Sequence, residues 1–349
     1  MSLSIGIVGL PNVGKSTLFN ALVKARQAQA SNFAFTTIDP NVGIVDVPDP
    51  RLQQLYDIVV GNSKSEALNS KQIPNSNVLN PKIIPATVKF IDIAGLVKEA
   101  HKGEGLGNKF LSHIRETDAI CMVLRCFEDE NILHVSGKID PKDDFETIKT
   151  ELELADLQTK EKLTAKSQQP TAEPINISFL ADKPMIFAAN VNEKDAALSP
   201  AEIIKKFNLE KLIVDSGSLI VVSAKVEQDL IDLDENEQKE YLQSLGLEKS
   251  GLDRLIKSAY HTLGLQSYFT AGPMEVRAWT IKIGDTAPVA AGKIHTDFQR
   301  GFIKAEVIGY DDYIKYNGEQ GARTAGRFRQ EGKDYIMNDG DIVEFRFNV

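Results

Sequence analysis

The chain has 349 residues, of which 42% are hydrophobic and 26% charged, a composition typical of soluble globular proteins long enough for two domains. No run of about 18 apolar residues predicts a transmembrane helix, and residues 4–10 lack the basic flank of a secretory signal. We therefore expect a cytoplasmic protein that does not contact membranes. The net charge of −9 argues against nonspecific nucleic-acid binding over the whole surface, but the segment from Gln266 onward is nearly neutral, with 11 basic and 12 acidic residues.

Residues 4–8 form a short apolar run typical of a buried strand, and Gly9-Leu-Pro-Asn-Val-Gly-Lys-Ser16 follows at once. Residues 17–24 then place Leu18, Phe19 and Leu22 on one helical face. A strand, a glycine loop and a helix in this order are the context that a Walker A phosphate-binding loop requires. The pattern predicts a nucleoside triphosphate site.

Each part of this loop has an expected role. Gly9 and Gly14 let the backbone approach phosphates, and the loop N–H groups with the helix N-terminus attract anions. Lys15 is expected to reach the terminal phosphates, and the Ser16 hydroxyl to bind Mg²⁺. The side chain of Asn12 is of the type that binds K⁺ in related loops, or it stabilises the loop alone. The expected phosphate-binding residues are Asn12, Val13, Gly14, Lys15, Ser16 and Thr17.

Two further segments are expected to complete the metal and γ-phosphate site. A threonine before a second strand at residues 42–47 can bind Mg²⁺, and Thr37 is preferred to Thr36. Residues 87–93 alternate like a strand that ends in Asp92-Ile-Ala-Gly95. Asp92 is expected to act on the metal through water, and the Gly95 N–H to meet the γ-phosphate.

Three more buried strands are predicted at residues 119–127, 184–190 and 219–223. Strands that alternate with helices indicate an α/β fold with a doubly wound, mostly parallel sheet. Ligands of such sheets bind at the carboxyl ends of the strands. The predicted base-binding residues are therefore Asn190, Val191, Ser223, Ala224 and Lys225. Cys121 and Cys126 both lie in the 119–127 strand and are expected to be reduced core thiols.

The motifs together resemble a known family. Residues 9–17, Asp92-Ile-Ala-Gly-Leu-Val97 and Gly103-Glu-Gly-Leu-Gly-Asn-Lys-Phe110 resemble Obg-related GTPases of the TRAFAC class, and more closely the YchF/Obg-like ATPase family. Further matching segments are Asp49-Pro-Arg-Leu52, Ile114-Arg-Glu-Thr117, Arg125-Cys-Phe127, Gly292-Lys-Ile-His-Thr-Asp297 and Phe345-Arg-Phe-Asn-Val349. The resemblance implies ATP hydrolysis and a partner associated with the ribosome or translation.

The base-reading segment departs from the guanine-specific pattern. The usual Asn-Lys-x-Asp motif reads guanine through its carboxylate, whereas this chain has Asn190-Val-Asn-Glu193. Adenine offers a carboxylate no donor at N1 and has no 2-amino group, so guanine selectivity is expected to be lost in favour of ATP. The alternative is that Glu193 substitutes for aspartate and GTP still binds.

The residue that orients the attacking water is less evident. Leu96 occupies the position of the glutamine that serves this role in many Ras-like enzymes. Three histidines could replace it: His101, His113 and His134. We favour His134, which follows the fourth strand, and interpret His113 as packed within a helix.

The expected domains are residues 1–265, the P-loop domain, and residues 266–349. The first includes a surface insertion at 61–81 and a shortened helical arm at 140–180, in which Phe145, Ile148, Leu152 and Ala155 repeat like a heptad. Residues 275–281, 301–307 and 341–347 read as strands around a helix near Ala291, which resembles the β-grasp TGS domain of RNA- and ribosome-linked proteins. There, Arg323, Arg327, Arg329 and Lys333 surround Phe328 and could bind RNA or form a solvated charged hairpin.

The sequence thus predicts a monomeric, Mg²⁺-dependent, ATP-hydrolysing switch with slow intrinsic turnover. Two other functions stay open. One is a GTPase of the Obg class, and the other is a ribosome- or RNA-binding module that nucleotide stabilises and in which hydrolysis is incidental.

Overall fold

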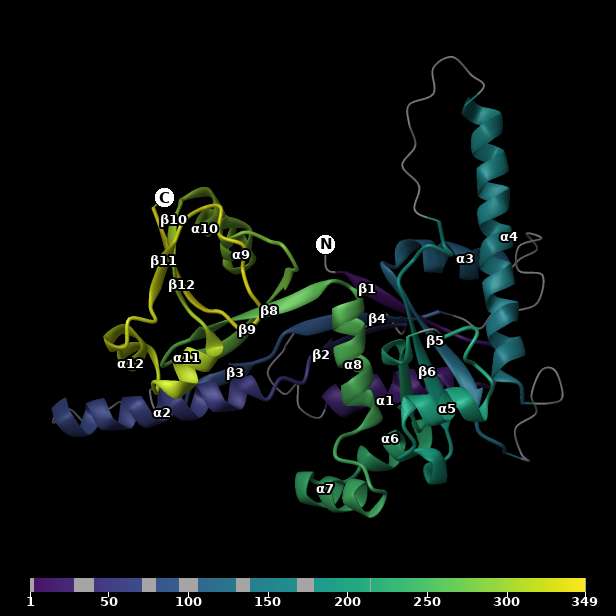
Figure 1. Ribbon diagram of the computed structural model, residues 1–349, viewed down its shortest axis with the longest axis horizontal. Helices are drawn as coiled ribbons and strands as arrows, with labels where there is room; N and C mark the ends of the chain where they lie inside the picture. The colour runs from purple at the N-terminus through teal and green to yellow at the C-terminus, as the bar shows by residue number, and fades with distance from the viewer. Residues whose placement is uncertain are drawn as a thin grey trace. The chain divides into compact units, whose positions relative to one another are not determined.

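The structure is a computed structural model that describes residues 3–27, 41–70, 80–93, 106–129, 139–167, 179–213 and 215–348. The chain divides into two compact units, Met1–Val45 with Val88–Leu263, and Asp46–Thr87 with Gly264–Val349 (Figure 1). Within the described ranges, no helix combines the length and apolar character needed to cross a bilayer.

The first unit is built on a six-stranded sheet in the order β2-β4-β1-β5-β6-β7. The pairings of β1 with β4 and β5, and of β6 with β5 and β7, are parallel. Every residue of β1 and β5 is buried, so both faces of the sheet are covered, as in a doubly wound fold. The predicted strands agree with the observed ones to within about a residue: β1 Ser4–Val8, β2 Val42–Asp46, β4 Thr87–Asp92, β5 Ala119–Cys126, β6 Met185–Val191 and β7 Leu219–Val222.

The helices of this unit begin at residues suited to helix starts. Ser199 and Asp234 each form a reciprocal capping box, and Ser250 accepts a hydrogen bond from the Asp253 N–H. These caps fix the loops that connect the sheet to its helices. The helices are α1 Lys15–Gln27, α3 Leu106–Glu116, α4 Pro141–Ser167, α5 Pro200–Lys206, α6 Ala224–Leu230, α7 Glu235–Ser244 and α8 Gly251–Thr262.

The expected arm is helix α4, 27 residues long, whose far end extends beyond the sheet (Figure 1). The four apolar positions predicted from heptad spacing are all buried. The returning chain is attached to the middle of this helix, because the Asp156 carboxylate accepts hydrogen bonds from the N–H groups of Leu180 and Ala181, each at 2.9 Å. Cys121 and Cys126 are both buried and unbridged, as predicted.

The second unit is a β-grasp fold. Strands β8 and β9 form an antiparallel hairpin, β10 and β12 pair antiparallel, and β12 lies parallel to β8. Helix α9 packs its alanines against Tyr268, Phe302 and Phe345 in the core. The bounds are β3 Lys82–Ile84, β8 Leu265–Ala271, β9 Glu275–Lys282, β10 Phe302–Ile308, β11 Arg329–Glu331, β12 Ile342–Phe347, α2 Arg51–Ser70, α9 Ala287–Ile294, α10 Thr296–Arg300, α11 Tyr310–Lys315 and α12 Glu319–Thr324.

The expected domain division is corrected at residues 46–87, which belong to the second unit rather than to the 1–265 domain. The physical reason is strand pairing, because β3 extends the β-grasp sheet in parallel register with β9. The predicted loop at 61–81 also differs, since residues 61–70 continue helix α2. The other boundary, expected after residue 265, lies after Leu263.

Arg51 fastens this excursion to the β-grasp sheet. Its guanidinium donates to both oxygens of Asp49 and donates to Asp339 at 2.7 Å. It also lies over the rings of Phe269, at 4.9 Å, and Tyr310, at 5.9 Å. Burial lowers the pKa of Arg51, but the two carboxylates more than reverse this and raise it above its ordinary value. The Asp49-Pro-Arg-Leu52 segment thus has a structural role within the second unit.

Glu227 gives the first unit a pH-dependent stability. Its buried carboxylate accepts hydrogen bonds from the N–H groups of Gly251, at 2.7 Å, and Leu252, at 3.3 Å. Burial raises its pKa from 4.5 to about 7, although these bonds lower it. The folded protein holds this proton more tightly than the unfolded chain does. The stability that protonated Glu227 contributes is therefore fully present below pH 4.5 and is lost as the pH rises through about 7.

We therefore expect Glu227→Gln to remove this decline and to make the protein more stable than wild type at pH 8, by about 1.4 kcal/mol per unit of pKa difference. Urea unfolding of both proteins at pH 5, 6 and 8 measures the difference. Glu248→Gln, at an exposed site, is the control and should track wild type. A Glu227→Gln curve parallel to wild type across this range would contradict the prediction.

Candidate nucleotide site

The phosphate loop connects β1 to α1 and contains two residues with left-handed backbone, Asn12 with φ of 67° and Gly14 with φ of 88°. A Cβ on Gly14 would lie 2.2 Å from Nδ2 of Asn190, so only glycine fits there. The Gly14 carbonyl accepts a hydrogen bond from the Leu18 N–H at 2.9 Å, which starts the helix. The loop therefore ends with the N-terminus of α1 facing the space where an anion binds.

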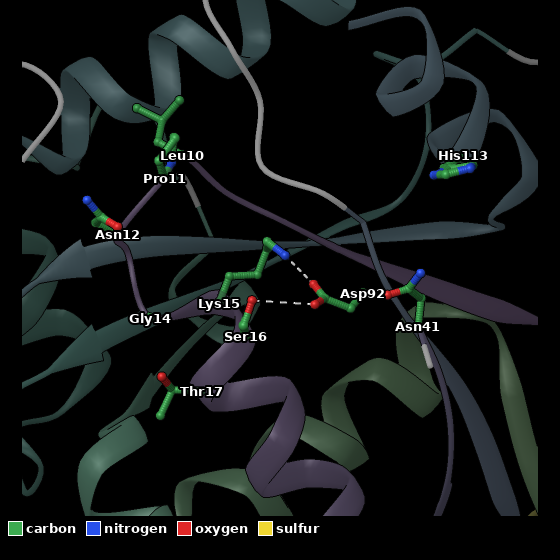
Figure 2. A pocket seen from close by; sticks show the side chains of 10 residues that line it. All are labelled: Leu10, Pro11, Asn12, Gly14, Lys15, Ser16, Thr17, Asn41, Asp92 and His113. Atoms are coloured by element: carbon green, nitrogen blue, oxygen red, sulfur yellow. Dashed lines mark hydrogen bonds and ion pairs between the residues drawn. The ribbon is translucent and has the colours of Figure 1, made fainter. Parts of the chain in front are cut away.

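A cavity of about 550 Å³ lies against this loop. Lys15 and Asp92 form an ion pair within it, and the Ser16 hydroxyl donates to the other Asp92 oxygen at 3.5 Å (Figure 2). Asp92 reaches this place because β4 runs parallel to β1, with Ile7 opposite Asp92. The cavity is lined by Leu10, Pro11, Asn12, Gly14, Lys15, Ser16, Thr17, Asn41, Asp92 and His113.

The oxygens of Ser16 and Asp92 are of the kind that Mg²⁺ prefers. The Ser16 hydroxyl can bind the metal directly. The Asp92 carboxylate, whose Oδ2 lies 3.5 Å from Ser16 Oγ, is near enough to accept a hydrogen bond from a water on the metal. The Lys15 ammonium, which pairs with Asp92, shows that this spot favours a cation.

A second cavity of about 640 Å³ lies at the carboxyl ends of β5, β6 and β7. Asn12, Gly14 and Thr17 line both cavities, so the two share a wall made by the phosphate loop. The remaining lining residues are Phe127, Glu128, Asp129, Asn190, Val191, Asn192, Glu193, Lys194, Ala224, Lys225 and Gln228.

Asn190 connects the walls of this second cavity. Its amide nitrogen donates to the Val13 carbonyl at 2.9 Å, and its amide oxygen accepts from the Ala224 N–H at 3.0 Å. Asn190 is buried, so both bonds form away from water. Ser223, also predicted to bind the base, instead caps α6 by accepting from the Val226 N–H at 3.5 Å. Lys225 lines the cavity.

The base-reading segment forms the other side of this cavity. Glu193 lines it, followed by Lys194, in a short 3-10 turn that Asn192 caps by accepting from the Asp195 N–H at 3.0 Å. Glu193 therefore lies beside the space that a base would fill. The lysine of the guanine-reading motif is absent between Asn190 and Glu193.

Several expected residues lie outside the described ranges: Thr37, Gly95, Leu96, His101 and His134. The interpretation of His113 as packed is wrong, because its side chain is exposed and lines the first cavity. Sequence reasoning also missed Asn41, Phe127 and Gln228 as lining residues. Of these, only Phe127 could have been found from the sequence, because it lies directly after a strand of the sheet, where ligands bind.

Asn190→Asp tests the bridge between the cavities. Aspartate keeps the acceptor for Ala224 but places an oxygen against the Val13 carbonyl, so we expect at least tenfold weaker nucleotide binding, about 1.4 kcal/mol, and a lower Tm. Asn236→Asp is the matched control, because Asn236 is exposed at the start of α7 and lines neither cavity. Calorimetric titration measures both variants, and an unchanged affinity in Asn190→Asp would mean that the bridge does not support binding.

Comparison with known proteins identifies the family. Residues 4–190 match the family model MMR_HSR1, described as a 50S ribosome-binding GTPase, and residues 265–348 match YchF-GTPase_C, described as a protein of unknown function. The chain is 48% identical to the ribosome-binding ATPase YchF of Escherichia coli O157:H7 over 387 residues, and 46% identical to that of Bacillus subtilis (strain 168) over 388 residues, with 100% of each chain covered. The solved structure of the Schizosaccharomyces pombe YchF GTPase matches with a TM-score of 0.81 and 34% identity, over 99% of this chain and 98% of that one. The chain therefore belongs to the YchF family of P-loop nucleotide hydrolases.

Proposed function

We propose that this protein is a Mg²⁺-dependent ATPase that acts as a switch on the ribosome. The observation that carries the proposal is the pair of joined cavities, one with the phosphate loop and Asp92, the other with Glu193 and without the guanine-reading lysine. The bacterial relatives are named ribosome-binding ATPases, whereas the fission yeast relative is named a GTPase. The identity of the base is therefore the point to test.

The residues of the first cavity have distinct proposed tasks. Lys15, which pairs with Asp92, would turn to the β- and γ-phosphates and leave the carboxylate to a metal-bound water. Ser16 and Thr37 would hold Mg²⁺, which supplies charge for the leaving phosphate, and the Gly95 N–H would sense the γ-phosphate. Asn12, which lines both cavities, would hold K⁺, and His134 would orient the attacking water.

The proposal for the second cavity is selection against guanine. Guanine selectivity needs an acceptor aimed at both N1–H and the 2-amino group, and Glu193 is longer than the aspartate that usually provides it. Asn190 uses both ends of its amide to join Val13 and Ala224. We propose that adenine is held mainly by backbone groups around Asn190 and Val191, with Ala224 and Lys225 opposite.

Calorimetric titration with ATP and GTP, in Mg²⁺ with K⁺ or Na⁺, tests this assignment. We expect ATP to bind at least tenfold more tightly, about 1.4 kcal/mol, and Lys15→Ala to lose affinity for both nucleotides. Equal or tighter GTP binding would return the protein to the Obg-class GTPases. Identical ATP hydrolysis rates in K⁺ and Na⁺ would contradict the proposal that Asn12 binds K⁺.

The ribosome or its RNA is the proposed partner of the second unit, but the basic cluster expected from the sequence is a weak phosphate site. Arg323 pairs with Glu319 at 2.7 Å and with Glu306 at 3.7 Å. Arg327 lies 3.8 Å from Asp312, and Arg329 lies 3.2 Å from Glu331. Carboxylates thus offset the charges of the three arginines, and among the described residues only Lys333 of this cluster has no ion pair, so the net attraction for phosphate is small.

Arg277 on β9 is a better candidate contact for RNA. Its guanidinium lies 3.9 Å from the ring centroid of Trp279, and no described residue forms an ion pair with it. The Trp279 Nε1–H donates to Thr270 at 3.0 Å, which fixes the ring. The Trp279 ring itself is stacked on Tyr268, so the guanidinium that lies over it is the group that can stack on a base or contact a phosphate.

Arg277→Ala is therefore expected to weaken binding of a labelled single-stranded oligoribonucleotide about tenfold in anisotropy measurements, since it removes a charged stacking contact of about 1–3 kcal/mol. Arg323→Ala is the matched control and should bind like wild type. Weaker RNA binding in Arg323→Ala alone would indicate that the basic cluster, and not Arg277, contacts RNA.

Normal ribosome binding by Lys15→Ala would favour the alternative function, a docking module with incidental hydrolysis.

A further inference from the structure

Arg125 is a buried arginine beside the nucleotide cavities for which the reaction outlined above has no task. It is the next-to-last residue of β5, and its side chain is only 1% exposed. Removing a guanidinium from water is unfavourable unless its donors find partners. Its contacts therefore indicate why an arginine stands there.

The described contacts of Arg125 reach two segments that form the second cavity. Its Nε donates to the Phe127 carbonyl at 3.3 Å, and its Nη1 donates to the Asn12 carbonyl at 3.5 Å. The guanidinium also lies 4.6 Å from the centroid of the Phe127 ring. One side chain thus contacts both the backbone and the ring of Phe127, and the turn of the phosphate loop.

Both of these partners need a fixed position. Phe127 follows the end of β5 and lines the second cavity, where an aromatic ring can stack on a base. Asn12 has a left-handed φ of 67°, which asparagine tolerates, and its carbonyl is the group to which Arg125 donates. Asn12 also lines both cavities, so a shift there changes the phosphate site as well.

We propose that Arg125 is a positioning residue that fixes the aromatic wall of the base cavity to the turn of the phosphate loop. Affinity for the nucleotide and discrimination between bases then depend on one buried guanidinium that does not touch the nucleotide. The inference rests on the proposed function only in that it takes the second cavity as the base site.

Lysine cannot replace arginine in this arrangement. The guanidinium donates from Nε and Nη1 in two directions and is flat enough to lie over a ring, whereas an ammonium is a point charge at the end of a flexible chain. Arg125→Lys therefore keeps the charge but loses the connection between Phe127 and Asn12.

We expect Arg125→Lys to raise the KM for ATP about tenfold, to change kcat less than threefold, and to bring the ATP and GTP affinities closer together. Lys183→Met is the matched control, because Lys183 is also buried and also donates to backbone carbonyls, those of Arg115 and Thr117, outside the cavity linings. The control should lower Tm without changing the ratio of the two affinities.

A double-mutant cycle with Phe127→Leu separates positioning from general stability. If Arg125 acts through Phe127, adding Arg125→Lys to Phe127→Leu has a smaller effect on affinity than Arg125→Lys has alone. Additive effects, or an Arg125→Lys protein with a lower Tm and wild-type affinities, would overturn the proposal. If the wild-type protein bound ATP and GTP equally well, that result would contradict the proposed preference for ATP. The double-mutant cycle would still test Arg125, because it compares affinities for one nucleotide.

Discussion

The amide of Asn190 holds together three segments that are far apart in the sequence: the phosphate loop, the end of β6 and the start of α6. An amide is suited to this because it offers a donor and an acceptor at once, and both are used in a place that water does not reach. The amide also occupies the space where a side chain on residue 14 would lie. The proposed phosphate and base sites thus share the same few atoms.

Two arginines of this protein, the buried Arg125 and the partly exposed Arg51, connect chain segments. Arg51 joins the 46–87 excursion to the β-grasp sheet through two carboxylates and two rings. Arg125 joins the end of β5 to the phosphate loop. In each case a planar guanidinium donates hydrogen bonds in fixed directions and also lies over an aromatic ring, a combination that the point charge of a lysine does not provide. Two of the family segments, Asp49-Pro-Arg-Leu52 and Arg125-Cys-Phe127, thus have a physical explanation.

The local pattern of the sequence was enough to predict the six strands of the first sheet and the phosphate loop, because buried parallel strands are continuous apolar runs and glycine spacing marks the loop. Pairing between distant segments could not be predicted in this way. Strand β3 is only three residues long, and its partner β9 lies far along the chain. Residues 61–70 are rich in polar side chains and read as a loop, yet they continue a helix that begins at Arg51. Two of the carboxylates that offset the basic cluster, Glu306 on β10 and Asp312 on α11, come from other elements and could not be read from the local pattern either.

The excursion of residues 46–87 has a consequence for how the protein is made. A ribosome releases these residues long before β8 and β9, against which helix α2 buries Leu52, Leu55 and Val59. Until synthesis reaches the last quarter of the chain, which contains β8 and β9, an apolar helix face and the edge of a short strand lack these partners. Such surfaces favour aggregation or chaperone binding. The first unit must therefore fold around a long unfinished loop, and the sheet of the second unit closes only after β12 has been synthesised.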